Sequence, residues 1–192
     1  TATAGWSVRY HHSSVVLPDG SIVVMGGMSD YSGGGYKNDV WRSTDKGVTW
    51  MTMTAHAGWT PRWGHSSVAM PDGSIVLMGG EDDNYPYFKN DVWRSTDNGA
   101  TWTQMSAAPG WSARFGHSLT IVPDGSIVLL GGADAGGNRN DVWRSADNGA
   151  SWTMVKPNDT TGWTGRYWHS SKAMPDGSIV LLGGYDGVPH ND

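Results

Sequence analysis

The sequence predicts an all-β protein made of repeated four-stranded units. Within the 192 residues, one motif returns at intervals of about 52 residues, and each unit carries turn-forming segments at the same places. No unit shows helical periodicity over three turns. The 28 glycines and 12 tryptophans agree with many short strands that are joined by tight turns around an aromatic core.

Each repeat begins with an arginine in the pattern G-W-[ST]-x-R-aromatic-x-H-S. The successive arginines are 53, 52 and 52 residues apart, at Arg9, Arg62, Arg114 and Arg166. Each unit continues with P-D-G-S and Gly-Gly, and the complete units end with N-D-V-W-R-S-x-D-x-G-x-[TS]-W. This order divides the chain into three complete units, 1–53, 54–105 and 106–157, and a half unit, 158–192.

One unit contains two predicted hairpins. In the first unit, apolar or β-branched runs at 12–17 and 21–25 flank Pro-Asp-Gly, and they predict strands a and b. The runs at 39–43 and 48–52 flank Thr-Asp-Lys-Gly and predict strands c and d. One such unit cannot bury both faces of its sheet, whereas radially packed units bury them against each other. The sequence therefore predicts the blades of a β-propeller.

Two family resemblances follow from these motifs. The order R-x-x-H, hydrophobic strand, Gly-Gly and late Trp resembles the kelch repeat over essentially the whole chain. The segments 43–50, 95–102 and 145–152 resemble the Asp-box, S-x-D-x-G-x-[TS]-W, of sialidases and other secreted propeller enzymes. In those families the Asp-box is a structural turn remote from catalysis. The resemblance thus implies a structural role for Asp45, Gly47, Trp50, Asp97, Gly99, Trp102, Asp147, Gly149 and Trp152.

The fourth unit stops at Asn191-Asp192, where Val-Trp-Arg-Ser would follow in the other units. Propellers close with about four to eight blades. We therefore expect this segment to be part of a larger ring that is completed by missing sequence or by a second chain. An intact mass that matches 192 residues, together with monomeric behaviour on sizing, would contradict this expectation.

Composition argues against several classes of partner. The net charge is −5, and the 13 lysines and arginines are scattered singly, which disfavours nucleic acid and anionic membrane surfaces. No apolar run approaches the roughly 20 residues of a membrane helix. The absence of cysteine removes disulfides, thiolate metal sites and thiol nucleophiles. We expect no cofactor, no metal, no nucleic-acid partner and no membrane insertion.

The blade topology sorts the loops into two faces. The a–b and c–d turns share one end and hardly vary between units, whereas the b–c and d–a connections share the other end and differ in length and chemistry. Because binding loops are usually variable connections on a rigid scaffold, we expect function on this variable face. The candidate binding residues are aromatic side chains private to single units and two residues that replace a repeated glycine. They are Tyr31, Tyr36, Tyr85, Tyr87, Phe88, Tyr185, His11 and Trp168.

Repetition also separates scaffold from chemistry, because a catalytic residue need not recur in every blade. The histidines of the R-x-x-H motif and the aspartates at the start of strand c recur, so we interpret both sets as framework. The repeated arginines allow two hypotheses. Each pairs with a repeated aspartate, which we favour, or the set forms an anion site for a carboxylate or sulfate at the mouth of the central channel. That set is Arg9, Arg62, Arg114 and Arg166.

The sequence favours a non-catalytic module that binds protein or glycan through the variable face. The main alternative is a fragment of a secreted, sialidase-like glycoside hydrolase, but Glu81 is the only glutamate and no spacing of acids suggests a catalytic pair. A structural spacer or shell component is a third possibility. A copper radical site like that of galactose oxidase requires a Cys-Tyr crosslink in that family. This sequence has no cysteine, which argues strongly against such a site. The Asp-box resemblance and the sequon Asn158-Asp159-Thr160 suggest an extracellular or cell-surface location.

Overall fold

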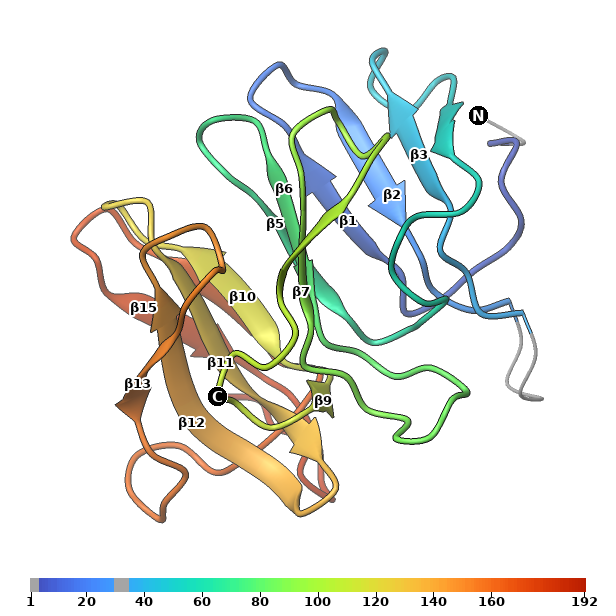
Figure 1. The fold of residues 1–192 in the computed structure, drawn as a ribbon. Coiled ribbons are helices and arrows are strands. Elements are labelled where there is room, and N and C mark those ends of the chain that lie inside the picture. Colours follow the sequence, from blue (N-terminus) through green and yellow to red (C-terminus); the bar gives the residue numbers. More distant parts are fainter. Residues whose placement is uncertain (1–3, 30–34) are drawn as a thin grey trace.

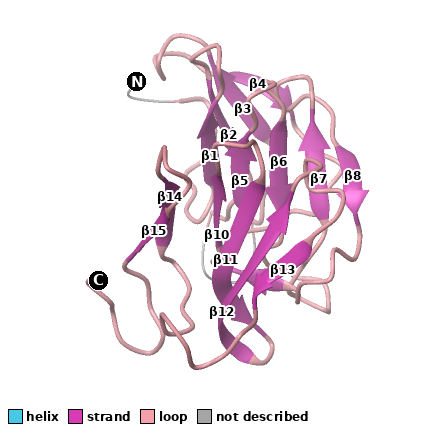
Figure 2. Cartoon of the chain, turned by 90° about the vertical axis from the view of Figure 1, so that its left-hand side faces the viewer, coloured by secondary structure: helices cyan, strands magenta, loops and turns pink. Residues whose placement is uncertain are grey.

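The computed structural model describes residues 4–29 and 35–192, and within these ranges the chain forms strands and loops only (Figures 1 and 2). Neighbouring strands are antiparallel and follow the sequence order within each sheet. The first sheet contains β1 (Ser13–Val16), β2 (Ile22–Met25), β3 (Val40–Ser43) and β4 (Met51–Thr54). The second contains β5 (Ser66–Ala69), β6 (Ile75–Met78), β7 (Val92–Ser95) and β8 (Thr103–Ser106). The chain is therefore all-β, as predicted.

The third sheet is longer and is followed by a lone hairpin. It contains β10 (Ser118–Ile121), β11 (Ile127–Asp134), β12 (Gly137–Ser145) and β13 (Thr153–Lys156), and the short β9 (Arg114–Phe115) pairs with β11. Strands β11 and β12 lengthen because their connection is a tight turn at residues 135–136. The hairpin consists of β14 (Ser170–Ala173) and β15 (Ile179–Leu182).

The first strand of each unit lies innermost in the array. Strand β1 contacts β5, β5 contacts β10, and β10 contacts β14, so these four strands line one axis. The turns β1–β2, β5–β6 and β10–β11 lie at the upper end of the sheets in Figure 1, and the connections from β2 to β3, β6 to β7 and β11 to β12 lie at the lower end. We call the upper end the turn face and the lower end the variable face.

The Gly-Gly motif joins each sheet to the next. A Cβ atom on Gly26 would lie 2.6 Å from Cε1 of His65, so the imidazole from the second unit rests directly on this glycine. The next glycine, Gly27, donates its N–H to the carbonyl oxygen of Arg62 at 2.9 Å. The same contacts recur between Gly79 and His117, Gly80 and Arg114, Gly131 and His169, and Gly132 and Arg166. The repeated histidine and the doubled glycine are therefore two halves of one inter-sheet joint.

Apolar side chains fill the space between the sheets. Between the first two sheets, Val23, Met25 and Val40 pack against Trp59 and Leu77, and all five side chains are buried. The equivalent cluster between the second and third sheets is built from Val76, Met78, Val92, Trp111 and Leu129. A buried tryptophan contributes about 150–250 Å² of removed surface, so one indole per seam supplies much of the apolar burial.

Strand d begins later than the sequence suggests. We predicted residues 48–52 in the first unit, but β4 begins at Met51. The carboxylate of Asp45 accepts hydrogen bonds from the backbone N–H and the hydroxyl of Thr49, and the Ser43 hydroxyl accepts one from the N–H of Gly47. These bonds extend the turn as far as Trp50, whose indole N–H donates to the Gly47 carbonyl at 3.2 Å. The side-chain contacts of the turn therefore delay the strand.

Candidate functional site

The repeated arginines are hydrogen-bonded inside the protein, and three of them use all five guanidinium N–H groups. Arg114 donates Nη1 and Nη2 to the two carboxylate oxygens of Asp141, at 2.6 and 2.8 Å. Its remaining N–H groups donate to the carbonyls of Gly131 and Ser112 and to the Ser112 hydroxyl. All five guanidinium N–H groups thus have protein acceptors. Arg62 and Arg166 repeat the full pattern with Asp91 and Asp192.

The anion-site hypothesis is corrected by this arrangement. Arg9 likewise forms a two-bond pair with Asp39, and its guanidinium is fully buried. Burial alone would raise the pKa of Asp91, but the hydrogen bonds from Arg62 hold it below its ordinary value. The carboxylates therefore stay charged beside their arginines, and the four guanidinium groups act as inter-strand clamps with no fork directed at a ligand.

The repeated histidines line a central cavity of about 310 Å³ together with serines from β1, β5, β10 and β14. Burial lowers the pKa of His65 to about 3 and that of His169 to about 4, so both imidazoles are neutral near pH 7. Within residues 4–29 and 35–192, no three His, Asp or Glu side chains come together in a way that could hold a metal ion. The histidines mainly serve to pack against the Gly-Gly motif of the neighbouring sheet.

Aromatic rings from different units meet in the middle of the variable face. Trp168 stacks on His11 at 4.5 Å between ring centroids, and its ring also lies 6.0 Å from Trp63 and 5.7 Å from Phe115. Phe115 in turn stacks on Phe88 at 5.4 Å. The structure therefore brings three sequence candidates, His11, Trp168 and Phe88, into one cluster, which we call the aromatic centre.

His11 and Trp168 occupy the position that is glycine in the middle units. Gly64 and Gly116 both have φ of 63°, and His11 and Trp168 adopt nearly the same left-handed conformation, with φ of 54° and 59°. This conformation costs a non-glycine residue about 1–2 kcal/mol. Backbone bonds link the four positions in series, from Gly64 N–H to His11 O, from Gly116 N–H to Gly64 O, and from Trp168 N–H to Gly116 O. The repeat thus places two residues with aromatic side chains in a backbone conformation that favours glycine.

The most exposed candidate aromatics line a pocket next to the aromatic centre. Tyr85, Tyr87 and Phe88 from the β6–β7 connection face the β11–β12 turn across a pocket of about 410 Å³. Tyr85 is 87% exposed and Tyr87 is 53% exposed, and their rings meet edge to face. The rest of the lining comes from Pro86, Ser112, Ala113, Asp134, Ala135, Gly136 and Arg139. We call this the loop pocket.

The loop pocket contains functional candidates that the sequence analysis missed. Asp134 and Arg139 form an ion pair of 2.6 Å across the base of the β11–β12 turn, and Asp82 and Lys89 form the matching pair of 3.0 Å in the second unit. The sequence held a signal for these pairs. An aspartate follows Gly-Gly by two residues, and a basic residue precedes Asn-Asp, in both units and again at Asp186 and His190.

The other candidates lie apart from the loop pocket. Tyr185 packs edge to face on Tyr167 at 5.7 Å, on the far side of the aromatic centre. Tyr36 lines a separate pocket of about 420 Å³ with Trp41 and His56. Tyr31 lies outside the described residues. The described candidates therefore do not form one site, and Tyr36 lines a different pocket from Tyr85, Tyr87 and Phe88.

Glu81, the only glutamate, lies between the two loops as a bridge residue that pairs with Trp63 and Phe88. Burial and, secondarily, the charge of Asp82 raise the pKa of Glu81. A glycosidase needs a second carboxylate at a defined distance. The neighbouring Asp82 is buried and pairs with Lys89 at 3.0 Å, which ties this carboxylate to its own loop.

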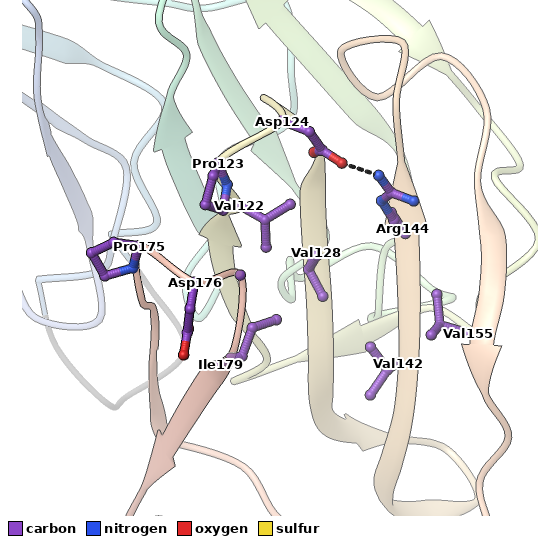
Figure 3. Close-up of a pocket in the computed structure, with 11 residues that line it drawn as sticks. Val122, Pro123, Asp124, Val128, Val142, Arg144, Val155, Pro175, Asp176 and Ile179 are labelled. Carbon is purple, nitrogen blue, oxygen red and sulfur yellow. Dashed lines mark hydrogen bonds and ion pairs between the residues drawn. The ribbon is translucent and has the colours of Figure 1, made fainter.

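A second groove lies on the turn face, between the third sheet and the β14–β15 hairpin (Figure 3). It has a volume of about 410 Å³, and Val122, Val128, Val142, Val155 and Ile179 form its apolar lining. Figure 3 shows the ion pair of Asp124 and Arg144 at its rim. The equivalent valines of the other sheets, Val40 and Val92, are covered by Gly99 and Gly149 of the next c–d turn. The groove therefore lies at the position that a c–d turn covers in the first two sheets.

The family follows from the sequence comparison. Residues 2–192 match the family described as the KLHDC2/KLHL20/DRC7 Kelch-repeats domain. The chain belongs to this Kelch-repeat family. The solved structure "Structure of YjhT" is similar to this protein, with a TM-score of 0.73 and 20% sequence identity. The similar region covers 92% of this protein and 59% of the YjhT chain. At this identity the likeness supports the kelch β-propeller fold alone.

Curated relatives align with part of the Kelch-repeat chain. Multiple epidermal growth factor-like domains protein 8 of Mus musculus and the protein of the same name of Homo sapiens are each 32% identical over 131 residues. The aligned region is 65% of this chain and 5% of each relative. The fold and family indicate a binding or scaffold module. Among the described residues, no helix is long and apolar enough to cross a membrane.

Proposed function

We propose that the chain is a non-catalytic Kelch-repeat module that recognises a protein or glycan through the variable face. The observation that carries the proposal is a difference between residues that recur in every unit and residues that occur in one unit only. The repeated arginines form ion pairs with aspartates, and the repeated histidines pack between the sheets. Tyr85 and Tyr87, which occur in one unit only, are exposed and line a pocket. Exposed tyrosines on rigid loops are typical of binding hot spots.

A secreted or cell-surface setting is part of this proposal. It is supported by the names of the mouse and human relatives, which refer to epidermal growth factor-like domains. The sequon residue Asn158 is exposed in the connection that follows β13, where an attached glycan would meet solvent. Glycosylation of Asn158 in a secreting host, measured by mass spectrometry, tests this part.

The test of function combines a glycan array, a displayed peptide library and a panel of glycoside hydrolase substrates. We expect retention of a glycan or a peptide without turnover of any substrate. Binding falls at least tenfold in Tyr85→Ala and Tyr87→Ala and is unchanged in Val48→Ala, which removes an exposed side chain from the turn face. Turnover would instead favour the glycosidase alternative. Glu81 would then be the first residue to test, because its pKa is raised. Silence in all three assays would favour a spacer or shell component.

A further inference from the structure

The loop pocket has the dimensions and walls of a binding site for one large side chain or small ligand. Its volume of about 410 Å³ lies within the usual range of ligand pockets, about 300–1,000 Å³. One wall consists of the consecutive residues Tyr85, Pro86, Tyr87 and Phe88, and the opposite wall is the backbone-rich turn at 134–136. Such a pocket offers aromatic and prolyl surface to an apolar group.

The aromatic wall is held in place before any ligand arrives. The Lys89 ammonium group donates to the carbonyl oxygens of Asn84 and Pro86, at 3.2 and 2.7 Å, and pairs with Asp82 at 3.0 Å. The carboxylate of Asp82 is completely buried, so the charge of Lys89 is anchored inside the loop. Phe88 is fixed further by its stack on Phe115. Binding therefore does not require ordering of this loop, which lowers the entropic cost.

The opposite wall carries the one guanidinium group of the pocket, and it is only partly used. Arg139 donates Nε to Asp134, whose other oxygen accepts the N–H of Gly136 at 2.8 Å. Neither Nη1 nor Nη2 of Arg139 has a hydrogen-bond acceptor within residues 4–29 and 35–192. Its side chain is 27% exposed, in contrast with Arg114, whose five N–H groups are all bonded. Arg139 thus presents free donors at the edge of an apolar pocket.

Besides Arg139, the polar side-chain groups of the lining that lack a hydrogen-bond partner among the described residues are the hydroxyls of Tyr85 and Tyr87. The Ser112 hydroxyl accepts from Arg114, Asp134 is held by Arg139, and Lys89 outside the lining is committed to its own loop. A pyranose ring that entered the pocket would bury several hydroxyl groups with few partners. Each unpaired hydroxyl costs about 1–3 kcal/mol. The chemistry therefore favours an occupant with a large apolar body and one anionic group.

We infer that the loop pocket binds a segment of a partner protein that inserts an aromatic or large aliphatic side chain between the two loops and places a nearby carboxylate on the Nη atoms of Arg139. This inference rests on the proposed binding function and names its ligand class. A carboxylate on a guanidinium group forms charge-assisted bonds that are about twice as strong as neutral ones.

The test begins with a displayed library of random peptides selected on the 192-residue chain. Enriched peptides should combine an aromatic or large aliphatic residue with Asp or Glu within a few positions. A synthetic peptide of the enriched sequence and its amide counterpart, with Asn for Asp or Gln for Glu, are then titrated against three variants. Arg139→Lys keeps the pair with Asp134 but removes the fork, Tyr87→Ala removes part of the apolar wall, and Arg144→Lys makes the same arginine change on the turn face.

We expect Arg139→Lys to weaken the acidic peptide about tenfold and to leave the amide peptide nearly unchanged. Tyr87→Ala should weaken both peptides about tenfold, and Arg144→Lys should weaken neither. Equal loss of the two peptides in Arg139→Lys would overturn the role of the carboxylate, and thermal unfolding of each variant excludes a folding defect. Retention of a glycan that depends on Tyr87, with no enriched peptide, would overturn this inference and leave the proposed function standing. Binding that ignores Tyr87 and Arg139 would overturn both.

Discussion

The seam between the first two sheets and the groove beside the β14–β15 hairpin are built from the same repeat, yet they differ in burial. In the seam, Val40 is fully buried because Gly99 of the following c–d turn lies against it. In the groove, the equivalent Val142 is only partly buried, and the nearby Val155 is 62% exposed. The difference teaches that a blade of this chain completes its core with the turn of its neighbour. The expected completion of a larger ring stays a prediction.

The largest expected contrast concerns the arginine clamps of the two regions. Asp141→Ala should destabilise the protein by about 3–5 kcal/mol, because it leaves the buried guanidinium of Arg114 without its carboxylate. Asp192→Ala should have a smaller effect, because the carboxylate of Asp192 is 64% exposed and water reaches that clamp. Urea unfolding of the two variants measures the contrast. Equal losses would mean that the clamp at the hairpin is as well enclosed as the inner one.

A pair of glycine variants separates backbone strain from the contact between blades. Gly99→Ala and Gly47→Ala both place a side chain on a left-handed backbone, which costs about 1–2 kcal/mol in each. Only at Gly99 would the new Cβ also meet a neighbour, at 2.6 Å from Cγ1 of Val40, and overpacking of this kind adds about 1–3 kcal/mol. At Gly47 the nearest atom is Cζ2 of Trp50 at 3.8 Å. If the melting temperatures fall equally, the c–d turn does not close the seam.

Truncation of the valines tests the same comparison more gently. Val92→Ala removes a fully buried side chain and should cost about 2–3 kcal/mol. Val142→Ala should cost less than about 1 kcal/mol, because its side chain already meets solvent in the groove. Denaturant midpoints with unchanged m-values would establish the difference. A large loss for Val142→Ala would show that the groove is closed in solution.

The histidine joints predict a loss of stability in mild acid. Burial holds the pKa of His65 at about 3, whereas an unfolded histidine titrates near pH 6.5. Below about pH 6.5 the unfolded chain therefore takes up a proton that the folded chain does not, and stability falls as the pH decreases toward about 3. His65→Gln should flatten this dependence more than His12→Gln, because the His65 side chain is buried and the His12 side chain is only half-buried. Urea midpoints between pH 7 and pH 4 measure the slopes, and parallel slopes would count against the joint.

Much of the scaffold was predictable from particular residues. The period of the arginines, the P-D-G turns and the Gly-Gly pairs predicted the all-β kelch fold, because each motif has one local structural solution that recurs. The pairing of Arg62 with Asp91 was favoured from recurrence alone, and the structure shows it. The start of β4 was missed because the hydrogen bonds of Asp45 to Thr49 depend on three-dimensional contact within the turn.

The candidate site was predictable only in part. The sequence marked Tyr85, Tyr87 and Phe88 as private aromatic residues on a variable loop, and these do line a pocket. It missed Arg139, whose role follows from the short β11–β12 turn that carries it to the opposite wall. It also grouped Tyr36 and Tyr185 with them, although Tyr36 lines another pocket. Residues in different units approach each other only when the sheets pack, so loop length and neighbour position decide the grouping.

By itself, the sequence determined the repeat, the strand pairs within each blade and the separation of a constant from a variable face, because these depend on short-range spacing and turn chemistry. Only the tertiary structure decided which guanidinium groups have all their N–H donors hydrogen-bonded within the protein. Arg114 is enclosed by five acceptors from its own blade, whereas Arg139 keeps two nitrogens open toward the loop pocket. The physical reason is that the hydrogen-bond saturation of an arginine is a property of its surroundings in space and not of its spacing along the chain.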